Sequence, residues 1–193
     1  MASKNSSMLI ESFENKIKIN DYAFAYQLYD ARKGASSGKE WKASVFFVIA
    51  LIMLFMILME NFNLGKVPVA SIVLLICMYM CTYYIYLLPK KAKLEGEHIY
   101  KSSRLLSKSS KVEIYRDYFV MKNEYEYILR YNIEISDCIE TDSSFVLIGG
   151  YEHRISVISK KYLTPEQCEN ISLHFKREMV RQYRQIKSPS KRK

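Results

Sequence analysis

The chain has 193 residues and a formal net charge of +9, and 49% of its residues are hydrophobic while 25% are charged. Disordered chains hold fewer apolar residues, fully embedded chains hold fewer charges, and the four cysteines are too few for a disulfide scaffold. The apolar residues gather in two stretches, 43–59 and 67–88, which contain no charged residue. The composition therefore predicts a small membrane protein with a soluble part of about one domain.

Residues 1–40 predict a short strand followed by an amphipathic helix. Residues 1–7 are expected to form a loose tail, and lysine alternates with isoleucine in residues 16–19, as in a strand. Asn20 or Asp21 can cap a helix that runs to about residue 33. One face of this helix carries Tyr22, Tyr26 and Tyr29. Such a face either binds a ligand or lipid or, more commonly, packs on the cytoplasmic domain or rests at the membrane interface.

Residues 41–89 predict a hairpin of two membrane-spanning helices. At ~1.5 Å per residue, residues 43–59 cover about 26 Å and residues 67–88 about 33 Å, against a hydrocarbon core of ~30 Å. The short link 60–66 forces the two helices to be antiparallel. Four aromatic side chains are expected at the level of the lipid headgroups: Trp41, Tyr83, Tyr84 and Tyr86.

Basic residues flank the hairpin outside both apolar stretches. They are Arg32, Lys33, Lys39 and Lys42 before the first stretch, and Lys90, Lys91 and Lys93 after the second. By the positive-inside rule both termini face the cytoplasm, and no earlier apolar stretch suggests a signal peptide. Cys77 and Cys81 lie one helical turn apart in the second span. They suit a lipidation or metal pair or, as we favour, packing against the other helix.

The pattern after the hairpin changes from helical to strand-like. Residues 90–110 predict a juxtamembrane helix, which continues past Pro89 with a kink toward residue 106, and then a linker. From residue 111 a period of two predicts strands near residues 112–115, 119–122, 125–131, 136–141, 144–148 and 152–159, with a turn at Gly149-Gly150 before the last. In the third strand Tyr125, Tyr127, Leu129 and Tyr131 share one face, and Glu126 and Arg130 share the other.

The last predicted element is an amphipathic helix. Thr164-Pro165-Glu166-Gln167 supplies an N-cap, a proline at the first helical position and a glutamine that closes a capping box. The helix is expected to reach residue 186, because one stripe holds Cys168, Ile171, Phe175, Met179, Tyr183 and Ile186. The complete pattern predicts a membrane α-helical hairpin plus an α+β cytoplasmic domain over residues 111–187, followed by a basic tail, 188–193.

Several features together resemble the YcxB-like family of small bacterial membrane proteins. They are the start Ile17-Lys-Ile-Asn-Asp-Tyr22, the two adjacent apolar spans, and the soluble domain that runs from Val112-Glu-Ile-Tyr-Arg-Asp-Tyr118 to the terminal helix. The third and most specific segment is Ile158-Ser-Lys-Lys-Tyr-Leu-Thr-Pro-Glu-Gln167. In the third, Ser159-Lys-Lys161 replaces the proline-and-basic pattern usual where the family's last strand ends. The resemblance implies a multi-pass protein of the bacterial plasma membrane with a PH-like domain, a bent antiparallel sheet capped by the C-terminal helix. It implies no activity.

No catalytic, cofactor or metal motif is recognisable in the sequence. There is no HExxH, no CxxC and no glycine-rich phosphate loop. The three histidines are His98, His153 and His174, and His174 is expected on the polar side of the terminal helix. We therefore expect no enzyme, no cofactor and no metal site.

Most of the net charge lies near the C-terminus. Residues 160–193 hold ten lysines and arginines against three acids. Arg177, Arg181 and Arg184 are expected on the helix face opposite the apolar stripe, and Lys187 extends the charge. This face is either simply solvated or in contact with anionic lipid or an acidic partner. Nucleic acid is not an expected partner, because base-stacking aromatics and groove-entering motifs are missing.

These patterns favour a non-enzymatic, membrane-tethered interaction or regulatory protein, whose cytoplasmic domain binds a partner at the inner membrane face. The alternative is an immunity-type membrane protein that protects against a toxin or bacteriocin. The expected partners are the lipid bilayer and an unidentified protein, and a homo-oligomer is a further alternative.

Overall fold

The computed structural model describes residues 8–33, 38–59, 67–149 and 155–186, and the chain forms two compact units. One unit consists of Met1–Tyr26 and Gly96–Lys193, which we call the sheet unit, and the other consists of Gln27–Glu95. Several predicted features lie outside the described residues: the tail 1–7, the link 60–66, Gly150, His153, Lys187 and the tail 188–193.

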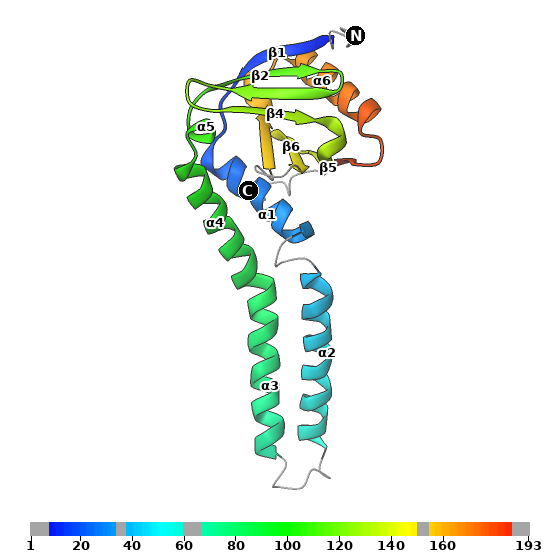
Figure 1. Cartoon of the computed structure of the whole chain (residues 1–193). Helices are drawn as coiled ribbons and strands as arrows, with labels where there is room; N and C mark the ends of the chain where they lie inside the picture. Colours follow the sequence, from blue (N-terminus) through cyan, green and yellow to red (C-terminus); the bar gives the residue numbers. More distant parts are fainter. Residues whose placement is uncertain (1–7, 34–37, 60–66, 150–154, 187–193) are drawn as a thin grey trace, which may run out of the picture. The chain divides into compact units, whose positions relative to one another are not determined.

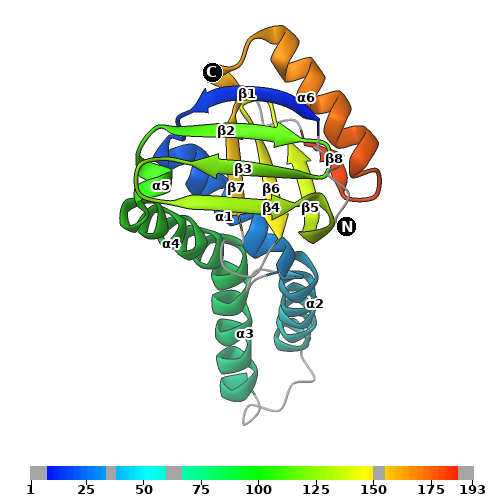
Figure 2. The same cartoon turned by 45° about the horizontal axis from the view of Figure 1, so that its top comes forward.

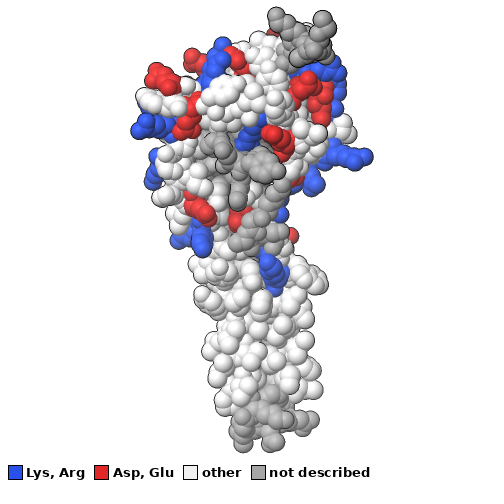
Figure 3. All heavy atoms as spheres, in the orientation of Figure 1, with Lys and Arg blue, Asp and Glu red and all other residues white. Residues whose placement is uncertain are grey.

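The unit Gln27–Glu95 contains two apolar helices, α2 (Lys39–Leu58) and α3 (Val67–Thr82), which lie side by side (Figure 1). Two helical stretches, Lys39–Leu58 and Pro68–Ser102, are long and apolar enough to cross a membrane. They cover the predicted spans 43–59 and 67–88 except for one residue of each, Met59 and Val67. Figure 3 shows almost no charged side chains along α2 and α3 on the face drawn, which agrees with their sequence.

A π-helical turn follows α3. This segment, η1 (Tyr83–Leu87), runs directly into α4 (Leu88–Ser102), and the backbone N–H of Leu88 bonds to the carbonyl of Tyr83. Pro89 has no N–H to donate to the preceding turn, and the widened turn accommodates it without ending the helix. The predicted continuation past Pro89 is confirmed. The helix stops at Ser102, however, because Ser103 caps a separate short helix, α5 (Arg104–Ser107).

The sheet unit contains two four-stranded sheets (Figure 2). The first has the order β1-β2-β3-β4 and consists of β1 (Leu9–Asn15), β2 (Ser110–Tyr115), β3 (Tyr118–Lys122) and β4 (Tyr127–Tyr131). The second has the order β7-β6-β5-β8 and consists of β5 (Ile135–Glu140), β6 (Ser144–Gly149), β7 (Ile155–Ser159) and β8 (Tyr183–Gln185). Neighbouring strands are antiparallel except for β5 and β8, which are parallel. The sheets and helices together confirm the α+β class.

The N-terminal strand lies elsewhere than predicted. β1 occupies Leu9–Asn15 rather than residues 16–19. It precedes the two apolar helices in the chain, yet it pairs with β2, which follows them. The sheet of the predicted domain 111–187 therefore includes a strand from the first 40 residues. Residues 16–19 instead lead into α1 (Ile19–Lys33), where the carbonyl of Lys18 accepts the N–H of Asp21. Four alternating residues fit a helix entry as well as a strand, since both bury Ile17.

Asn15 joins the two sheets. Its side chain is fully buried, Nδ2 donates to the carbonyl of Val157 at 2.9 Å, and Oδ1 accepts the N–H of Ser159 at 2.9 Å. A buried amide is costly unless its hydrogen bonds are made, so these two bonds hold β1 against β7.

α1 confirms the predicted helix and buries much of its tyrosine face. Tyr22 and Tyr29 are buried, and Tyr26 is half-buried. Gly96 of α4 approaches α1 so closely that a Cβ atom there would lie 2.8 Å from the Cβ of Tyr26. This close approach supports the interpretation that the face packs rather than binds a ligand.

The terminal helix α6 (Pro165–Glu178) begins as predicted. The hydroxyl of Thr164 accepts the N–H of Gln167, and the Gln167 side chain accepts the N–H of Thr164, which completes the capping box. Phe175 is fully buried and meets the ring of Phe145 on β6 edge-on, with 5.7 Å between centroids.

The prediction that this helix reaches residue 186 is wrong. The backbone of Met179, with φ −122° and ψ 45°, leaves the helical region, and Tyr183–Gln185 forms β8 instead. A spacing of four between Met179 and Tyr183 fits a helix, but it fits equally a turn that returns the chain to the sheet.

Candidate functional site

The outer side of the first sheet carries an exposed group of aromatic and apolar side chains. We call it the tyrosine face, and it consists of Tyr115, Tyr118, Tyr127, Leu129 and Tyr131. Along β4 the exposed fractions are 63% for Tyr127, 38% for Leu129 and 48% for Tyr131. The predicted alternation is confirmed over Tyr127–Tyr131, because Ile128 and Arg130 point inward, but Tyr125 and Glu126 lie in the turn before the strand. The apolar side of β4 therefore faces solvent while Arg130, 3% exposed, lies in the core.

The rings of this face support one another. Tyr115 and Tyr118 stack with centroids 4.6 Å apart and planes at 23°, and Tyr118 meets Tyr131 of the neighbouring strand at 5.8 Å and 62°. Tyr118 and Tyr131 are direct cross-strand partners. Stacked aromatic pairs hold their rotamers, so the surface is already ordered before any partner arrives. The signal in the sequence was that tyrosines fall on the same side of three consecutive strands.

Charged side chains lie beside the tyrosine face. Glu113 on β2 accepts from Lys111 at 2.9 Å and from Lys122 at 3.0 Å. Hydrogen bonds from these two lysines lower the pKa of Glu113 to about 2. The carboxylate thus stays charged at neutral pH, and the two ammonium groups are held in place at the edge of the face.

A cavity of about 620 Å³ opens at the end of the first sheet where Lys111 pairs with Lys122. Its lining residues include Lys108, Lys111, Lys122, Asn123 and Tyr125. The Lys108 Nζ donates to the Tyr125 hydroxyl at 2.8 Å and lies 4.2 Å from the centre of its ring. Arg104 lies over the same ring at 5.4 Å. Ammonium groups next to aromatic rings suit a ligand that presents acidic side chains beside apolar ones.

The structure does not place the predicted arginines on one helix face. Arg177 lies on α6, where its Nε donates to Glu178 at 3.0 Å, Arg181 lies in the turn after the helix, and Arg184 lies on β8. The predicted common face is wrong because α6 ends before Met179. All three side chains are exposed, and Lys187 lies outside the described residues. Their contact with lipid or partner stays a prediction.

The predicted interface aromatics gather at one end of the α2–α3 pair. Tyr84 stacks on Phe46 of α2 at 6.0 Å, and the Lys42 ammonium lies 5.9 Å from its ring. Tyr83 packs edge-on against Tyr84 at 5.5 Å. Trp41 and Tyr86 are 74% and 70% exposed, as side chains at a membrane interface are expected to be.

The two cysteines of the second span pack within the helix pair. Cys77 is buried, and the Cys81 Sγ donates to the carbonyl of Ala43 on α2 at 3.5 Å. These contacts support the packing interpretation. Across the described ranges, no three His, Cys, Asp or Glu side chains are grouped so that they could hold a metal ion.

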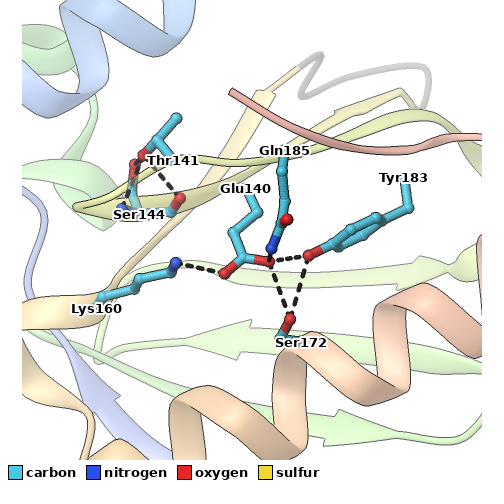
Figure 4. Close-up of polar contacts among 7 residues, drawn as sticks. All are labelled: Glu140, Thr141, Ser144, Lys160, Ser172, Tyr183 and Gln185. Atoms are coloured by element: carbon cyan, nitrogen blue, oxygen red, sulfur yellow. Dashed lines mark hydrogen bonds and ion pairs between the residues drawn. The ribbon is translucent and has the colours of Figure 1, made fainter. Parts of the chain in front are cut away.

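A half-buried carboxylate, Glu140, organises the C-terminal part of the second sheet (Figure 4). Its Oε1 accepts from Lys160 at 2.7 Å, and its Oε2 accepts from Ser172 at 2.9 Å, from Gln185 at 3.1 Å and from the Tyr183 hydroxyl. Burial alone would raise the pKa of Glu140, but the hydrogen bonds from Lys160, Gln185 and Ser172 outweigh it and lower the pKa. This group, the Glu140 cluster, was not predicted, because its members come from four separate elements.

His174 differs from its prediction. It is buried at 4% exposure rather than on the polar side of α6, and within the described part of the chain neither ring nitrogen has a hydrogen-bond partner. Burial lowers its pKa. The helical period is the reason, since position 174 follows Ile171 by three residues and so lies on the same side of the helix as Ile171 and Phe175, which both face the core.

Comparison with known proteins does not assign the chain to a family. No protein-family model matches the sequence, and no curated protein is significantly similar to it. The function has to be inferred from the chain's own residues, and the YcxB-like resemblance stays a prediction.

Proposed function

We propose that the chain is a non-enzymatic interaction protein, tethered by residues 41–89 in the plasma membrane of a bacterial cell with both termini in the cytoplasm. Its sheet unit would bind a protein partner at the inner membrane face. The tether is supported by the two long apolar helices, by the aromatic side chains at one end of the pair and by the flanking lysines.

The proposal includes a PH-like, YcxB-like fold for the sheet unit. It is supported by the antiparallel strands β1 to β7 and by the terminal helix α6, which begins with a capping box at Thr164 and buries Phe175 against the second sheet. Fold alone assigns no ligand, so binding has to be argued from a surface.

The tyrosine face is the observation that carries the binding proposal. Tyrosines are enriched in protein interfaces because they bury a large rigid area and keep a polar hydroxyl. Here Tyr118 stacks on Tyr115 and meets Tyr131 edge-on. At the other end of the face, Lys122 is the cross-strand partner of Tyr127 and lines the cavity together with Lys108 and Lys111. The surface fits a protein partner that presents apolar side chains flanked by acidic ones.

Photo-crosslinking in intact membranes tests this proposal. A photoreactive residue replaces Tyr127 in the full chain, and the matched control replaces Leu173, which is 57% exposed on α6 of the same unit. We expect position 127 to capture one defined protein that position 173 does not. That protein should then bind the purified wild-type chain and lose about tenfold or more in affinity when Tyr127 and Tyr131 are changed to serine. Identical products from both positions, or unchanged affinity of the serine variant, would refute the proposed surface.

A further inference from the structure

β8 differs from every other strand of the second sheet. It has three residues, it runs parallel to β5, and Arg184 and Gln185 are exposed. Its backbone is held at both ends, where Cys138 donates to the carbonyl of Gln182 at 3.0 Å and Ile186 donates to the carbonyl of Glu140 at 2.8 Å. β8 is thus a short, polar strand added to the outer edge of β5.

Tyr183 is the one aromatic anchor of this strand. Its hydroxyl donates to Glu140 and lies 3.2 Å from the Ser172 hydroxyl, and the Lys176 ammonium lies 5.5 Å from the centre of its ring. Gln185 adds a second side-chain bond to the same carboxylate oxygen at 3.1 Å. An extended peptide binds the edge of a sheet in the same way, through main-chain hydrogen bonds and a side chain that occupies a pocket.

The acceptor edge also has contacts that do not involve β8. The Glu140 carboxylate forms an ion pair with Lys160 at 2.7 Å and accepts a hydrogen bond from Ser172 at 2.9 Å. Release of β8 therefore leaves no unpaired buried charge, which would otherwise make release costly. Within the strand itself, Tyr183 is half-buried and the next two residues are exposed.

α6 is anchored without β8. Ile171, Phe175 and Met179 are almost fully buried, and the capping box fixes the start of the helix. The chain can therefore open after Met179, where a turn formed by bonds from Gln182 and Tyr183 to the Met179 carbonyl links α6 to β8. The structure thus places a short, three-residue strand between an acceptor edge and a helix that both have anchors of their own.

We infer that the outer edge of β5 is a strand-acceptor site, which β8 fills within its own chain and which the same C-terminal strand of a second copy fills between chains. A second copy is the occupant that fits, because its Tyr183 and Gln185 make the same contacts with Glu140 from another chain. The tyrosine face has no part in this inference.

A peptide with the sequence of residues 179–186 tests the acceptor edge. The purified full chain should bind it weakly, because β8 already occupies the site, and the Tyr183→Ala chain should bind it about tenfold or more tightly. Arg184→Ala is the matched control, since Arg184 is exposed on the same strand, and it should behave as the wild type. A peptide that carries alanine at the position of Tyr183 should not bind. Equal binding by the wild-type and Tyr183→Ala chains would overturn the inference.

Hydrogen exchange on the wild-type chain covers the case in which the variant does not fold. The amide of Ile186 should exchange through local opening, at least about tenfold faster than the fully buried β6 residues. Exchange of the Ile186 amide only with global unfolding would refute a detachable strand.

Two differently tagged copies then test whether β8 is exchanged between chains. A Tyr183→Ala copy should recover the wild-type copy better than the wild type recovers itself, and equal recovery would exclude a second copy as occupant.

Discussion

At the scale of single residues, His174 and Arg130 show how polar side chains are used inside the sheet unit. Arg130 lies in the core, where its Nη1 donates to the carbonyl of Gly149. Burial lowers the pKa of Arg130 to about 10, so the guanidinium is still charged at neutral pH. His174 is buried as well, but burial favours its neutral form. Arg130 therefore carries a constant positive charge, whereas the charge of His174 depends on pH.

The stability of the sheet unit should depend on His174 in mild acid. Burial lowers its folded-state pKa, an effect that Arg177 reinforces and that Glu178 and Asp117 oppose. Below the unfolded value of 6.5, the unfolded chain takes up a proton that the folded chain takes up only at lower pH, so stability falls as pH falls through this range. The free energy of unfolding of the full chain should therefore drop between about pH 7.5 and pH 5.5, and His174→Leu should reduce that drop. An equal drop in both proteins would contradict a buried neutral imidazole.

At the scale of the elements, α6 links the apolar core to the Glu140 cluster. Its inner face holds Phe175, which contacts Phe145, and Ser172, which donates to Glu140. The helix is therefore attached to the second sheet by packing and by hydrogen bonding at neighbouring positions.

Loss of the Phe175 ring should destabilise this attachment strongly. Because the side chain is fully buried, Phe175→Ala should cost about 3–5 kcal/mol. Leu173→Ala is the matched control on the same helix, since Leu173 is 57% exposed. Thermal unfolding of the full chain, followed by near-ultraviolet circular dichroism, should show a clearly lower Tm for Phe175→Ala only. Equal Tm values would mean that α6 is not part of the core.

The three exposed arginines should bring the end of α6 closer to an anionic membrane. Each base near the surface contributes ~1 kcal/mol, which salt weakens. A fluorophore at position 180 of the full chain in nanodiscs should show more energy transfer to a headgroup acceptor when anionic lipid is present, and less at high salt. Changing Arg177, Arg181 and Arg184 to glutamine should abolish the difference. If the glutamine variant keeps it, these arginines do not contact the lipid.

The sequence predicted elements better than their partners. Local signals located β2 to β7 and the start of α6, because alternation and the capping box act within a few residues. β1 and β8 were missed, since Asn15 is held by Val157 and Tyr183 by Glu140, far away in the chain. The tyrosine face was predicted as an alternation but not as a surface. The apolar content of Tyr127, Leu129 and Tyr131 suggests that their side of β4 is buried. The pairing of Ile128 with Met121, which is not visible in the sequence, shows that the opposite side of the strand faces the core.

At the scale of the whole molecule, the proposed topology puts both termini on the cytoplasmic side and the link 60–66 outside. A cysteine placed at Asn63 should react with a membrane-impermeant thiol reagent in intact cells, because the basic residues that flank the hairpin stay inside. A cysteine placed at Ser190 should react only after the cells are opened. Labelling at Ser190 alone in intact cells would reverse the assignment.

The hydrogen bonds from the Asn15 side chain to β7 determine when the two sheets can be joined during synthesis of the chain. The two partners of Asn15, Val157 and Ser159, follow it by 142 and 144 residues. At ~5–20 residues per second, a newly made β1 waits roughly 7–30 seconds for them. Both apolar helices are translated during that interval. Both helices are therefore synthesised before the sheets can close, and a nascent chain that stops before residue 157 holds an N-terminal strand that lacks its partners on β7.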